Sequence, residues 1–248
     1  WGKNTERQLG NGFGGSSVSS PVQVGNSTTD WVLAALGSNG GIAVKTNGAM
    51  WTWGDYRFNG QGGVNKDVPT QLGALTTWAS GRRSFSCGEL FSGAVKTDGT
   101  LWMWGYGRNG ALGQGNTTNY YSPVQVGALT NWASIACGDR AVMAVKTDGT
   151  LWAWGYQTYN TALMLGNNVV YSSPVQVGSD TNWAGVSLGN GHSLALKTDG
   201  TLWGCGYNAE GQLGQGNTTQ YSSPVQVGSG TSWSAPSGTY SNSAAMFS

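Results

Sequence analysis

Charged side chains are scarce in this chain of 248 residues. They make up 9% of the sequence, with 12 basic against 11 acidic residues and a formal net charge of +1. A protein that binds DNA or RNA needs a clustered basic face to neutralise phosphates, so we expect no nucleic-acid partner. The 42 glycines, together with abundant Ser, Thr and Asn, give a neutral hydrogen-bonding surface instead. Such a surface favours an extracellular, cell-surface or virion setting.

The residue types used for catalysis and metal binding are also few. His192 is the only histidine, and the nearest acid, Asp199, belongs to a turn, so no base and orienting carboxylate accompany it. Cys87, Cys137 and Cys205 form no Cys-x-x-Cys spacing, so a metal site has no support. Because there are three cysteines, at most one intramolecular disulfide can form and at least one thiol stays unpaired. We interpret the cysteines as small apolar core residues and His192 as a side chain that fastens a turn. The sequence thus predicts no enzyme activity, no metal and no cofactor.

Long apolar runs and helical periodicity are missing as well. No apolar segment approaches the ~20 residues that a membrane-spanning helix needs, so no membrane insertion is expected. Apolar residues come in short β-prone stretches broken by glycine, as in residues 132–145, without the i, i+3, i+4, i+7 stripe of a helix. The pattern predicts strands throughout and no helix.

What the chain does have is repetition. A phrase of the form Val-Lys-Thr-Asp-Gly-Thr-Leu-Trp-x-Trp-Gly occurs four times, and its lysines are 50 or 51 residues apart: Lys45, Lys96, Lys146 and Lys197. A second phrase, most often Pro-Val-Gln-Val-Gly, begins at five positions: Pro21, Pro69, Pro123, Pro174 and Pro224. A lone tryptophan follows each copy: Trp31, Trp78, Trp132, Trp183 and Trp233. A fixed period of this length indicates one supersecondary unit repeated several times.

Each unit is expected to contain four short strands. The first begins at the lone tryptophan, the second holds Ala-Val-Lys, the third Leu-Trp-x-Trp and the fourth Pro-Val-Gln-Val. Asp-Gly pairs such as Asp148-Gly149 supply the positive φ that a tight hairpin between the second and third strands needs. Proline suits the start of an outer strand, where its missing N–H removes no interior ladder bond.

Units of this kind are the blades of a β-propeller. We predict an all-β fold in which residues 1–248 form one domain of five four-stranded blades. The complete blades span residues 31–73, 78–127, 132–178 and 183–228, and residues 233–248 combine with residues 1–25 in a fifth blade closed by both termini. The third strand of that blade would be a stub at Trp1-Gly2. A start at an internal-looking tryptophan, without Met, favours a domain processed or excised from a longer polypeptide.

Three phrases carry a family resemblance: Asp-Gly-Thr-Leu-Trp-x-Trp-Gly, Gly211-Gln212-Leu213-Gly214, and Gly-His-Ser-Leu-Ala-Leu at residues 191–196. They resemble the repeat of the regulator of chromosome condensation family over nearly the whole chain. The resemblance implies a β-propeller, with the difference that the best-known members have seven blades.

The functions that this resemblance implies are diverse. They include a nuclear exchange factor for a small GTPase that also binds nucleosomes, a secreted β-lactamase inhibitor, and bacterial and phage surface proteins. The exchange factor uses a blade insertion and a basic tail that the sequence does not show, so guanine-nucleotide exchange is the least favoured of these functions. We expect a bacterial or phage-type member.

The thirteen tryptophans allow two interpretations. Burying each one between blades would contribute about 4–6 kcal/mol of gross apolar transfer, from ~25 cal/mol per Å² over ~150–250 Å², which suits a packing role. The alternative is a carbohydrate-binding, lectin-like propeller whose inter-blade aromatics stack on neutral sugars. Packing is favoured, and the lectin remains the second hypothesis.

Specificity is expected where the repeat breaks. Charged and aromatic residues gather in the loop at residues 55–58, an insertion follows Trp78, and an irregular stretch at residues 157–164 replaces the usual Gly-Gln-Leu-Gly turn. Aromatic and Arg side chains on loops of a rigid scaffold are typical of protein contact surfaces, whereas drift of solvent-facing loops is the other explanation. The candidate binding residues are Tyr56, Arg57, Phe58, Arg82, Arg83, Tyr159 and Met164.

These observations favour a non-enzymatic recognition or scaffold module, secreted, surface-displayed or virion-associated. Its expected partner is a protein or a cell-surface glycan.

We predict background turnover in hydrolase panels and in nucleotide-exchange assays with small GTPases, because every candidate acid, base and thiol is either a repeated turn residue or isolated. The measurement is product formation by the purified chain beside a His192→Ala variant. Robust turnover that disappears in His192→Ala would contradict the prediction.

Overall fold

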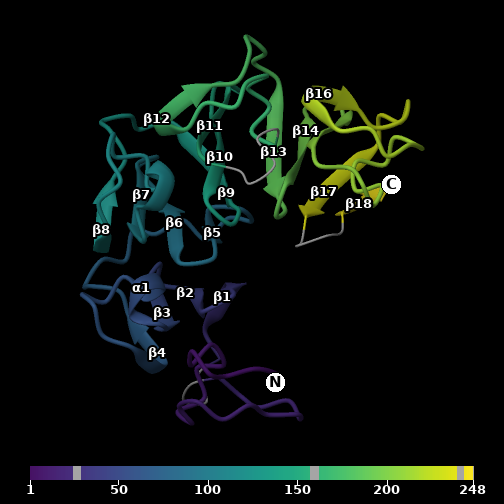
Figure 1. The fold of residues 1–248 in the computed structure, drawn as a ribbon. Helices are drawn as coiled ribbons and strands as arrows, with labels where there is room; N and C mark the ends of the chain where they lie inside the picture. Colours follow the sequence, from purple (N-terminus) through teal and green to yellow (C-terminus); the bar gives the residue numbers. More distant parts are fainter. Residues whose placement is uncertain (25–28, 157–161, 239–242, 248) are drawn as a thin grey trace. The chain divides into compact units, whose positions relative to one another are not determined.

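The computed structural model describes residues 1–24, 29–156, 162–238 and 243–247. Their contacts divide the chain into two units. The first unit holds Trp1–Arg108 with Thr118–Thr130, and the second holds Asn109–Thr117 with Asn131–Ser248. Each unit is described separately below (Figure 1).

The first unit contains two antiparallel four-stranded sheets, which we call blades 1 and 2. Blade 1 has the order β1 (Trp31–Gly37), β2 (Gly40–Lys45), β3 (Met50–Gly54), β4 (Lys66–Gln71). Blade 2 has the order β5 (Phe85–Cys87), β6 (Phe91–Val95), β7 (Leu101–Gly105), β8 (Tyr120–Gln125). The first strands of the two blades, β1 and β5, contact each other.

The second unit contains two more four-stranded sheets and one two-stranded sheet. Blade 3 consists of β9 (Trp132–Cys137), β10 (Ala141–Lys146), β11 (Leu151–Gly155) and β12 (Tyr171–Gln176). Blade 4 consists of β13 (Trp183–Leu188), β14 (His192–Lys197), β15 (Leu202–Gly206) and β16 (Tyr221–Gln226). The two-stranded sheet pairs β17 (Trp233–Gly238) with β18 (Ser243–Phe247). The predicted all-β class and the four complete blade sheets are confirmed.

The expectation of no helix is wrong at two short places, α1 (Tyr56–Asn59) and a 3-10 turn at Arg108–Gly110. The α1 turn forms because Asp55 caps it by accepting a hydrogen bond from the Arg57 N–H, and it ends at Gly60, whose φ of +71° is left-handed. A single capped turn has no room for a repeating apolar stripe, so periodicity could not reveal it.

The Asp-Gly hairpins fold as predicted. Between β10 and β11, Asp148 Oδ1 accepts hydrogen bonds from the Thr150 N–H (3.0 Å) and the Thr150 hydroxyl (2.6 Å). The Thr150 oxygen in turn accepts one from Trp152 Nε1 at 2.9 Å. Gly149 has a φ of +77°, and a Cβ there would collide with the carbonyl of Thr181, so only glycine fits.

Neighbouring segments are joined by an indole latch: the second tryptophan of the repeat donates its Nε1 proton to a loop carbonyl that precedes its blade. The three latches join Trp53 to Gln8 O, Trp104 to Phe58 O and Trp154 to Ala111 O, each at 2.9 Å. Trp104 and Trp154 are fully buried, so these N–H groups would be costly without the carbonyl. A Cβ on Gly60 would lie 2.7 Å from the Trp104 ring, which explains the glycine beside the second latch.

The composite fifth blade stays a prediction, but one of its expected strands is absent from the described residues. Residues 21–24 form no strand, and the N-terminal segment contains only the isolated bridge between Gly2 and Val18. The segment packs instead on blade 1, where Gly12 N donates to Asp67 O at 3.0 Å.

Beside β18 lies an open pocket of about 280 Å³ in the second unit. Leu213 from the loop after β15, Trp233 from β17, and Ala244 from β18 are among the residues that line it. None of the latch tryptophans is among the described residues that line this pocket.

We predict that Trp104→Phe lowers the free energy of unfolding by about 2–4 kcal/mol, because it removes a buried hydrogen bond and leaves a cavity. Trp102→Phe is the matched control, since Trp102 is only half-buried and bonds within its own hairpin; its loss should be about 1 kcal/mol. Chemical denaturation measures both. Equal losses would contradict the latch.

Candidate functional site

The turn α1 is held by a buried carboxylate. Asp55, which is 3% exposed, accepts hydrogen bonds from Arg57 Nε and Nη2 at 2.8 Å each and from the Arg57 N–H at 2.8 Å. Burial pushes the pKa of Asp55 upward, but the hydrogen bonds and charge of Arg57 outweigh burial and hold that pKa below its ordinary value. The same pair raises the pKa of Arg57. The guanidinium is therefore fixed in place and permanently charged.

Two tyrosines flank this ion pair. The rings of Tyr56 and Tyr121 are 5.6 Å apart at a tilt of 56°, and the guanidinium of Arg57 lies 5.7 Å from the Tyr56 ring. The Asn65 side chain accepts a hydrogen bond from the Tyr56 N–H at 2.7 Å, which fixes the backbone of the turn. We call Tyr56, Arg57 and Tyr121 the Tyr56 patch. All three are half-buried, so each side chain is packed on one side and open to solvent on the other.

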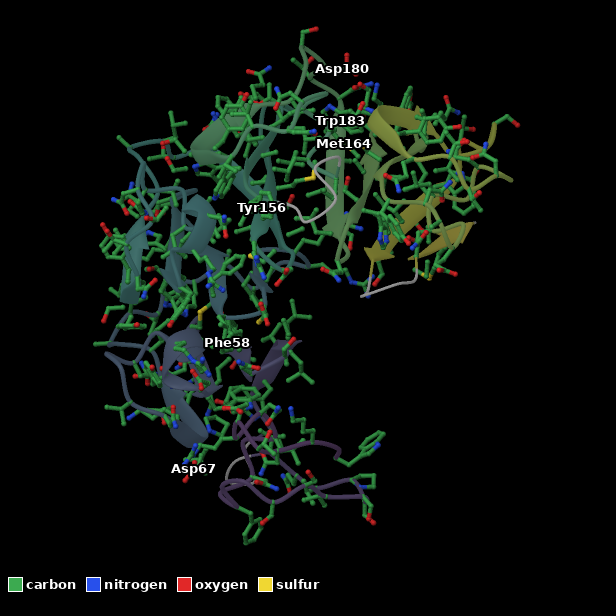
Figure 2. All side chains as sticks on the ribbon, viewed as in Figure 1. Phe58, Asp67, Tyr156, Met164, Asp180 and Trp183 are labelled. Carbon is green, nitrogen blue, oxygen red and sulfur yellow. The ribbon has the colours of Figure 1, made fainter. Side chains whose placement is uncertain are left out.

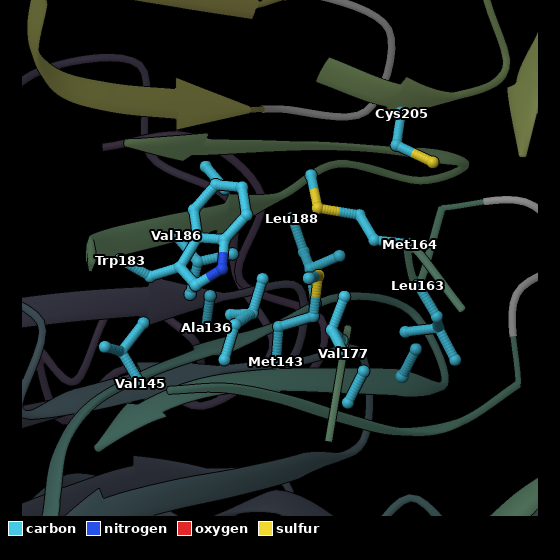
Figure 3. Close-up of a cluster of buried hydrophobic side chains, with 14 residues drawn as sticks. Ala136, Met143, Val145, Leu163, Met164, Val177, Trp183, Val186, Leu188 and Cys205 are labelled. Carbon is cyan, nitrogen blue, oxygen red and sulfur yellow. The ribbon is translucent and has the colours of Figure 1, made fainter. Parts of the chain in front are cut away.

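Two of the predicted binding residues are core residues instead. Phe58, labelled in Figure 2, lies on the α1 turn. It is 0% exposed, and its ring packs where a Cβ on Gly40 would be. Met164 is 4% exposed and belongs to the apolar cluster around Trp183 and Cys205 (Figure 3). Each sits in a loop that covers the following blade, so its apolar side chain is turned inward. Tyr159 lies outside the described residues.

The predicted insertion at Arg82-Arg83 is a bulge in the first strand of blade 2. Val95 O accepts from Ala79 N at 3.1 Å and Val95 N donates to Ser84 O at 2.7 Å, so the residues between Ala79 and Ser84 loop out of the ladder. The Ser84 hydroxyl ties this bulge together through the carbonyls of Ala79 (2.6 Å) and Gly81 (2.7 Å). Arg82 is exposed and Arg83 half-buried, and burial followed by the charge of Arg82 lowers the pKa of Arg83.

The Arg bulge and the Tyr56 patch lie at opposite ends of the strands. The α1 turn meets blade 2 where Phe91 pairs with Gly105, and both Ser92 Oγ (3.3 Å) and Trp104 Nε1 (2.9 Å) donate to Phe58 O there. The bulge lies beside Val95, at the other end of β6. The predicted residues therefore form two separate surfaces within the first unit.

A feature that sequence reasoning missed is a lysine placed between two indoles in every complete blade. The Nζ atom of Lys96 lies 5.2 Å from the Trp78 ring and 3.7 Å from the Trp102 ring, and Lys146 repeats this at 4.9 Å and 3.7 Å in blade 3. Lys45 and Lys197 occupy the same position in blades 1 and 4. We call each set a lysine cage. The constant spacing of the lysine from the lone tryptophan and from the Leu-Trp pair was the sequence pattern that could have predicted this arrangement.

Burying the ammonium group in a lysine cage is unfavourable because water is removed from it, and cation–π attraction to the two indoles opposes that loss. Lys96 is 8% and Lys146 6% exposed, and burial lowers the pKa of both, with Asp98 and Asp148 opposing the shift. The ring faces that a sugar would stack on are buried or covered by the lysine: Trp78, for example, is 3% exposed. The tryptophans thus have the packing role that the sequence favours.

The remaining chemistry-bearing side chains are built into the fold. His192 is 1% exposed, and its Nε2 lies 2.8 Å from the hydroxyl of Ser243 on β18, so it joins blade 4 to the two-stranded sheet. Burial raises the pKa of the Cys205 thiol to about 12. Among the described ranges, no three His, Cys, Asp or Glu side chains are grouped as metal ligands, and no helix there is long and apolar enough to cross a membrane.

Four-stranded repeats joined by indole latches, each with a lysine cage, define a β-propeller repeat protein. The family model described as Regulator of chromosome condensation (RCC1) repeat matches residues 98–145, 148–196 and 199–237, more than half of the chain. A second model of the same description matches residues 132–161 and 183–212. The chain belongs to the RCC1 repeat family.

Comparison with individual proteins gives the extent of this likeness. The Arabidopsis thaliana ultraviolet-B receptor UVR8 is 28% identical over 222 residues, which are 86% of this chain and 50% of the receptor. The structure of human WBSCR16 matches with a TM-score of 0.78 at 20% identity, over 94% of this chain and 62% of that one. Prp20p from Saccharomyces cerevisiae matches with a TM-score of 0.71 at 17% identity, over 89% and 57%. The chain therefore spans about half to three fifths of these relatives, and the structural matches show the fold alone.

We predict that Asp55→Asn lowers stability by about 1–2 kcal/mol at pH 7, the size expected for a charge-assisted hydrogen bond, and that the difference fades in acid. Because the pKa of Asp55 is depressed in the folded state, its contribution is full above the unfolded pKa near 3.8 and is lost as pH falls through the lower folded pKa. Thermal unfolding of both proteins between pH 7 and pH 2 measures this. A difference that stays constant to pH 2 would contradict the assignment.

Proposed function

We propose that this chain is a non-enzymatic, protein-binding propeller that recognises its partner through the Tyr56 patch. The observation that carries the proposal is the preorganisation of the patch: a buried Asp55 locks Arg57, and Arg57 and Tyr121 both contact the ring of Tyr56. Tyr and Arg are the side chains most enriched among binding hot spots, and a rigid side chain loses little entropy on binding.

The surroundings of the patch suit a protein surface. Val64, in the loop that follows α1, is 58% exposed, so apolar area lies next to the turn that carries the patch. Asn59 Nδ2 donates to Val64 O at 2.8 Å, which ties the loop after α1 to the turn itself. Apolar and aromatic residues around one fixed charge are the composition of an interface core.

The relatives point in the same direction. The study of Prp20p from Saccharomyces cerevisiae describes its binding properties to Gsp1p and histones, and a second structure shows Kap60 bound to it. These partners belong to Prp20p. They support protein binding as the general activity of this propeller class, and we extend only that activity to this chain.

The proposal includes a setting: a secreted, surface-displayed or virion-associated protein of bacterial or phage type. Its support is compositional, namely 9% charged residues and a net charge of +1 on a surface rich in neutral polar groups. A lectin function is not proposed, because the aromatics it relied on are buried or covered by lysine.

The test captures a partner by crosslinking the chain in an extract of the source organism and of the medium around it. The dissociation constant of the identified partner is then measured. We predict that Tyr56→Ala and Tyr121→Ala each weaken binding by about 1–2 kcal/mol, roughly 5- to 30-fold, as expected of hot-spot residues, with little change in Tm.

Tyr171→Ala is the matched control, because Tyr171 is a half-buried tyrosine at the start of an outer strand in the second unit. It should bind like the unmodified chain. Unchanged affinity in both patch variants would reject the Tyr56 patch, and turnover of a substrate by the chain would reject the non-enzymatic part of the proposal.

A further inference from the structure

The four lysine cages differ in one respect, which is whether the chain supplies a carboxylate to the ammonium group. Lys45 Nζ lies 3.1 Å from Asp30 Oδ1, and Lys197 Nζ lies 2.7 Å from Asp180 Oδ2. Across the described part of the chain, no carboxylate oxygen lies within 4 Å of the Nζ of Lys96 or Lys146. Two cages are therefore neutralised by the chain and two are not.

The position of the missing carboxylate can be located in blade 2. Asp30 directly precedes the lone tryptophan of blade 1, and its carbonyl accepts the N–H of Thr46 at 2.9 Å. Thr77 directly precedes Trp78, and its carbonyl accepts the N–H of Thr97 at 2.8 Å. The two residues are structural equivalents, so an exposed Thr77 stands where blade 1 has the partner of its lysine.

The neutralised cages show that a surface carboxylate can reach such a lysine. The side chains of Lys45 and Lys197 are only 11% and 12% exposed, yet the aspartates bound to them are 42% and 53% exposed. Lys96 is similarly buried, at 8% exposure. By analogy with Asp30 and Lys45, a carboxylate on a partner would approach Lys96 from the solvent side of the exposed Thr77.

Charge around the Lys96 cage favours an acidic ligand further. The bulge with Arg82 and Arg83 lies between Ala79 and Ser84, before β5, and its two ends pair with Val95, the residue before Lys96. The facing carboxylate, Asp98, already accepts hydrogen bonds from the Thr100 N–H (2.9 Å) and hydroxyl (2.6 Å). The backbone of the bulge thus places Arg82 and Arg83 at the end of β6 that precedes Lys96, and Asp98 is engaged in its own turn.

Blade 3 lacks these additions. Its lysine is also without a carboxylate, but its first strand has no basic insertion, and the residue equivalent to Asp30 is Asn131. The amide of Asn131 donates to Asp148 Oδ2 at 3.3 Å. Lys146 is therefore a natural comparison for Lys96.

We propose that the Lys96 cage, with Arg82 and Arg83, binds an aspartate or glutamate side chain in an acidic segment of a protein partner. The bound carboxylate would complete the ion pair that Asp30 completes in blade 1, while Trp78 and Trp102 hold the ammonium group in position. The inference rests on the proposed protein-binding function and adds a second contact surface, at the strand end opposite the Tyr56 patch.

The experiment titrates the intact chain with a fluorescein-labelled decaglutamate peptide and follows fluorescence polarisation. Thr77→Asp, which supplies an internal carboxylate, and Lys96→Met, which removes the charge, should each weaken binding at least tenfold. Thr77→Asn and Lys146→Met are the matched controls and should change the dissociation constant by less than threefold. Arg82→Ala alters an exposed side chain and should weaken binding about threefold.

Each outcome bears on the site. Absence of saturable binding to the unmodified chain, or unchanged affinity in Thr77→Asp with an unchanged Tm, would overturn the inference. Equal losses in Lys96→Met and Lys146→Met would overturn the assignment to blade 2. Thr77→Asp changes only an exposed residue, so the test stays valid even where Lys96→Met unfolds the chain.

Failure of the acidic site can be distinguished from failure of the protein-binding proposal. A captured partner that depends on Tyr56 but is indifferent to Thr77→Asp would leave the protein-binding function standing and remove the acidic site. Decaglutamate binding that depends on Lys96, with no partner dependent on Tyr56 or Tyr121, would support the acidic site and reject the Tyr56 patch.

Discussion

The hydrogen bond from a buried indole N–H to the carbonyl of a preceding loop is the constraint on which this architecture depends. A short four-stranded sheet cannot bury both faces alone, and 42 glycines make its ordered state entropically costly. The latch holds the loop that follows the third strand of one blade against the next blade. The side chains on that loop are thereby held in position as well. Phe58 is the example: its carbonyl receives Trp104, so the α1 turn and its Tyr and Arg side chains stand in one place.

The lysine cage is a second repeated feature. Its lysine is the same in blades 1–4, whereas the carboxylate that pairs with the lysine differs from blade to blade. An ammonium group between two indoles keeps the lone tryptophan and the third strand together at the hairpin end of each blade. Once this packing is secured, the counter-charge is free to vary. Blades 1 and 4 supply it themselves, and blades 2 and 3 do not. Repetition of the scaffold can therefore coexist with differences in what each blade presents to a ligand.

The sequence predicted what short-range rules determine. The period, the Asp-Gly hairpins and the strand order within a blade follow from turn chemistry and β-propensity, and the structure bears them out at Asp148-Gly149 and throughout blades 1–4. Departure from the repeat was a weaker guide to which loop residues are exposed. Phe58 and Met164 depart from the repeat because they fill gaps against the next blade, which only three-dimensional packing reveals. The opposite placement of the Arg bulge and the Tyr56 patch likewise depends on strand register.

Blade 4 has a cysteine in place of the latch tryptophan, and the reactivity of its thiol can be used to measure opening of this blade. Cys205 stands where the other blades have their second tryptophan, fully buried, with its thiol directed at Tyr221 O at 3.1 Å and with Met164 packed in the same cluster. A thiol with a pKa near 12 and no solvent contact does not react with alkylating reagents at neutral pH. Modification of Cys205 must therefore await an opening of blade 4, so its labelling rate reports the local opening equilibrium of this blade.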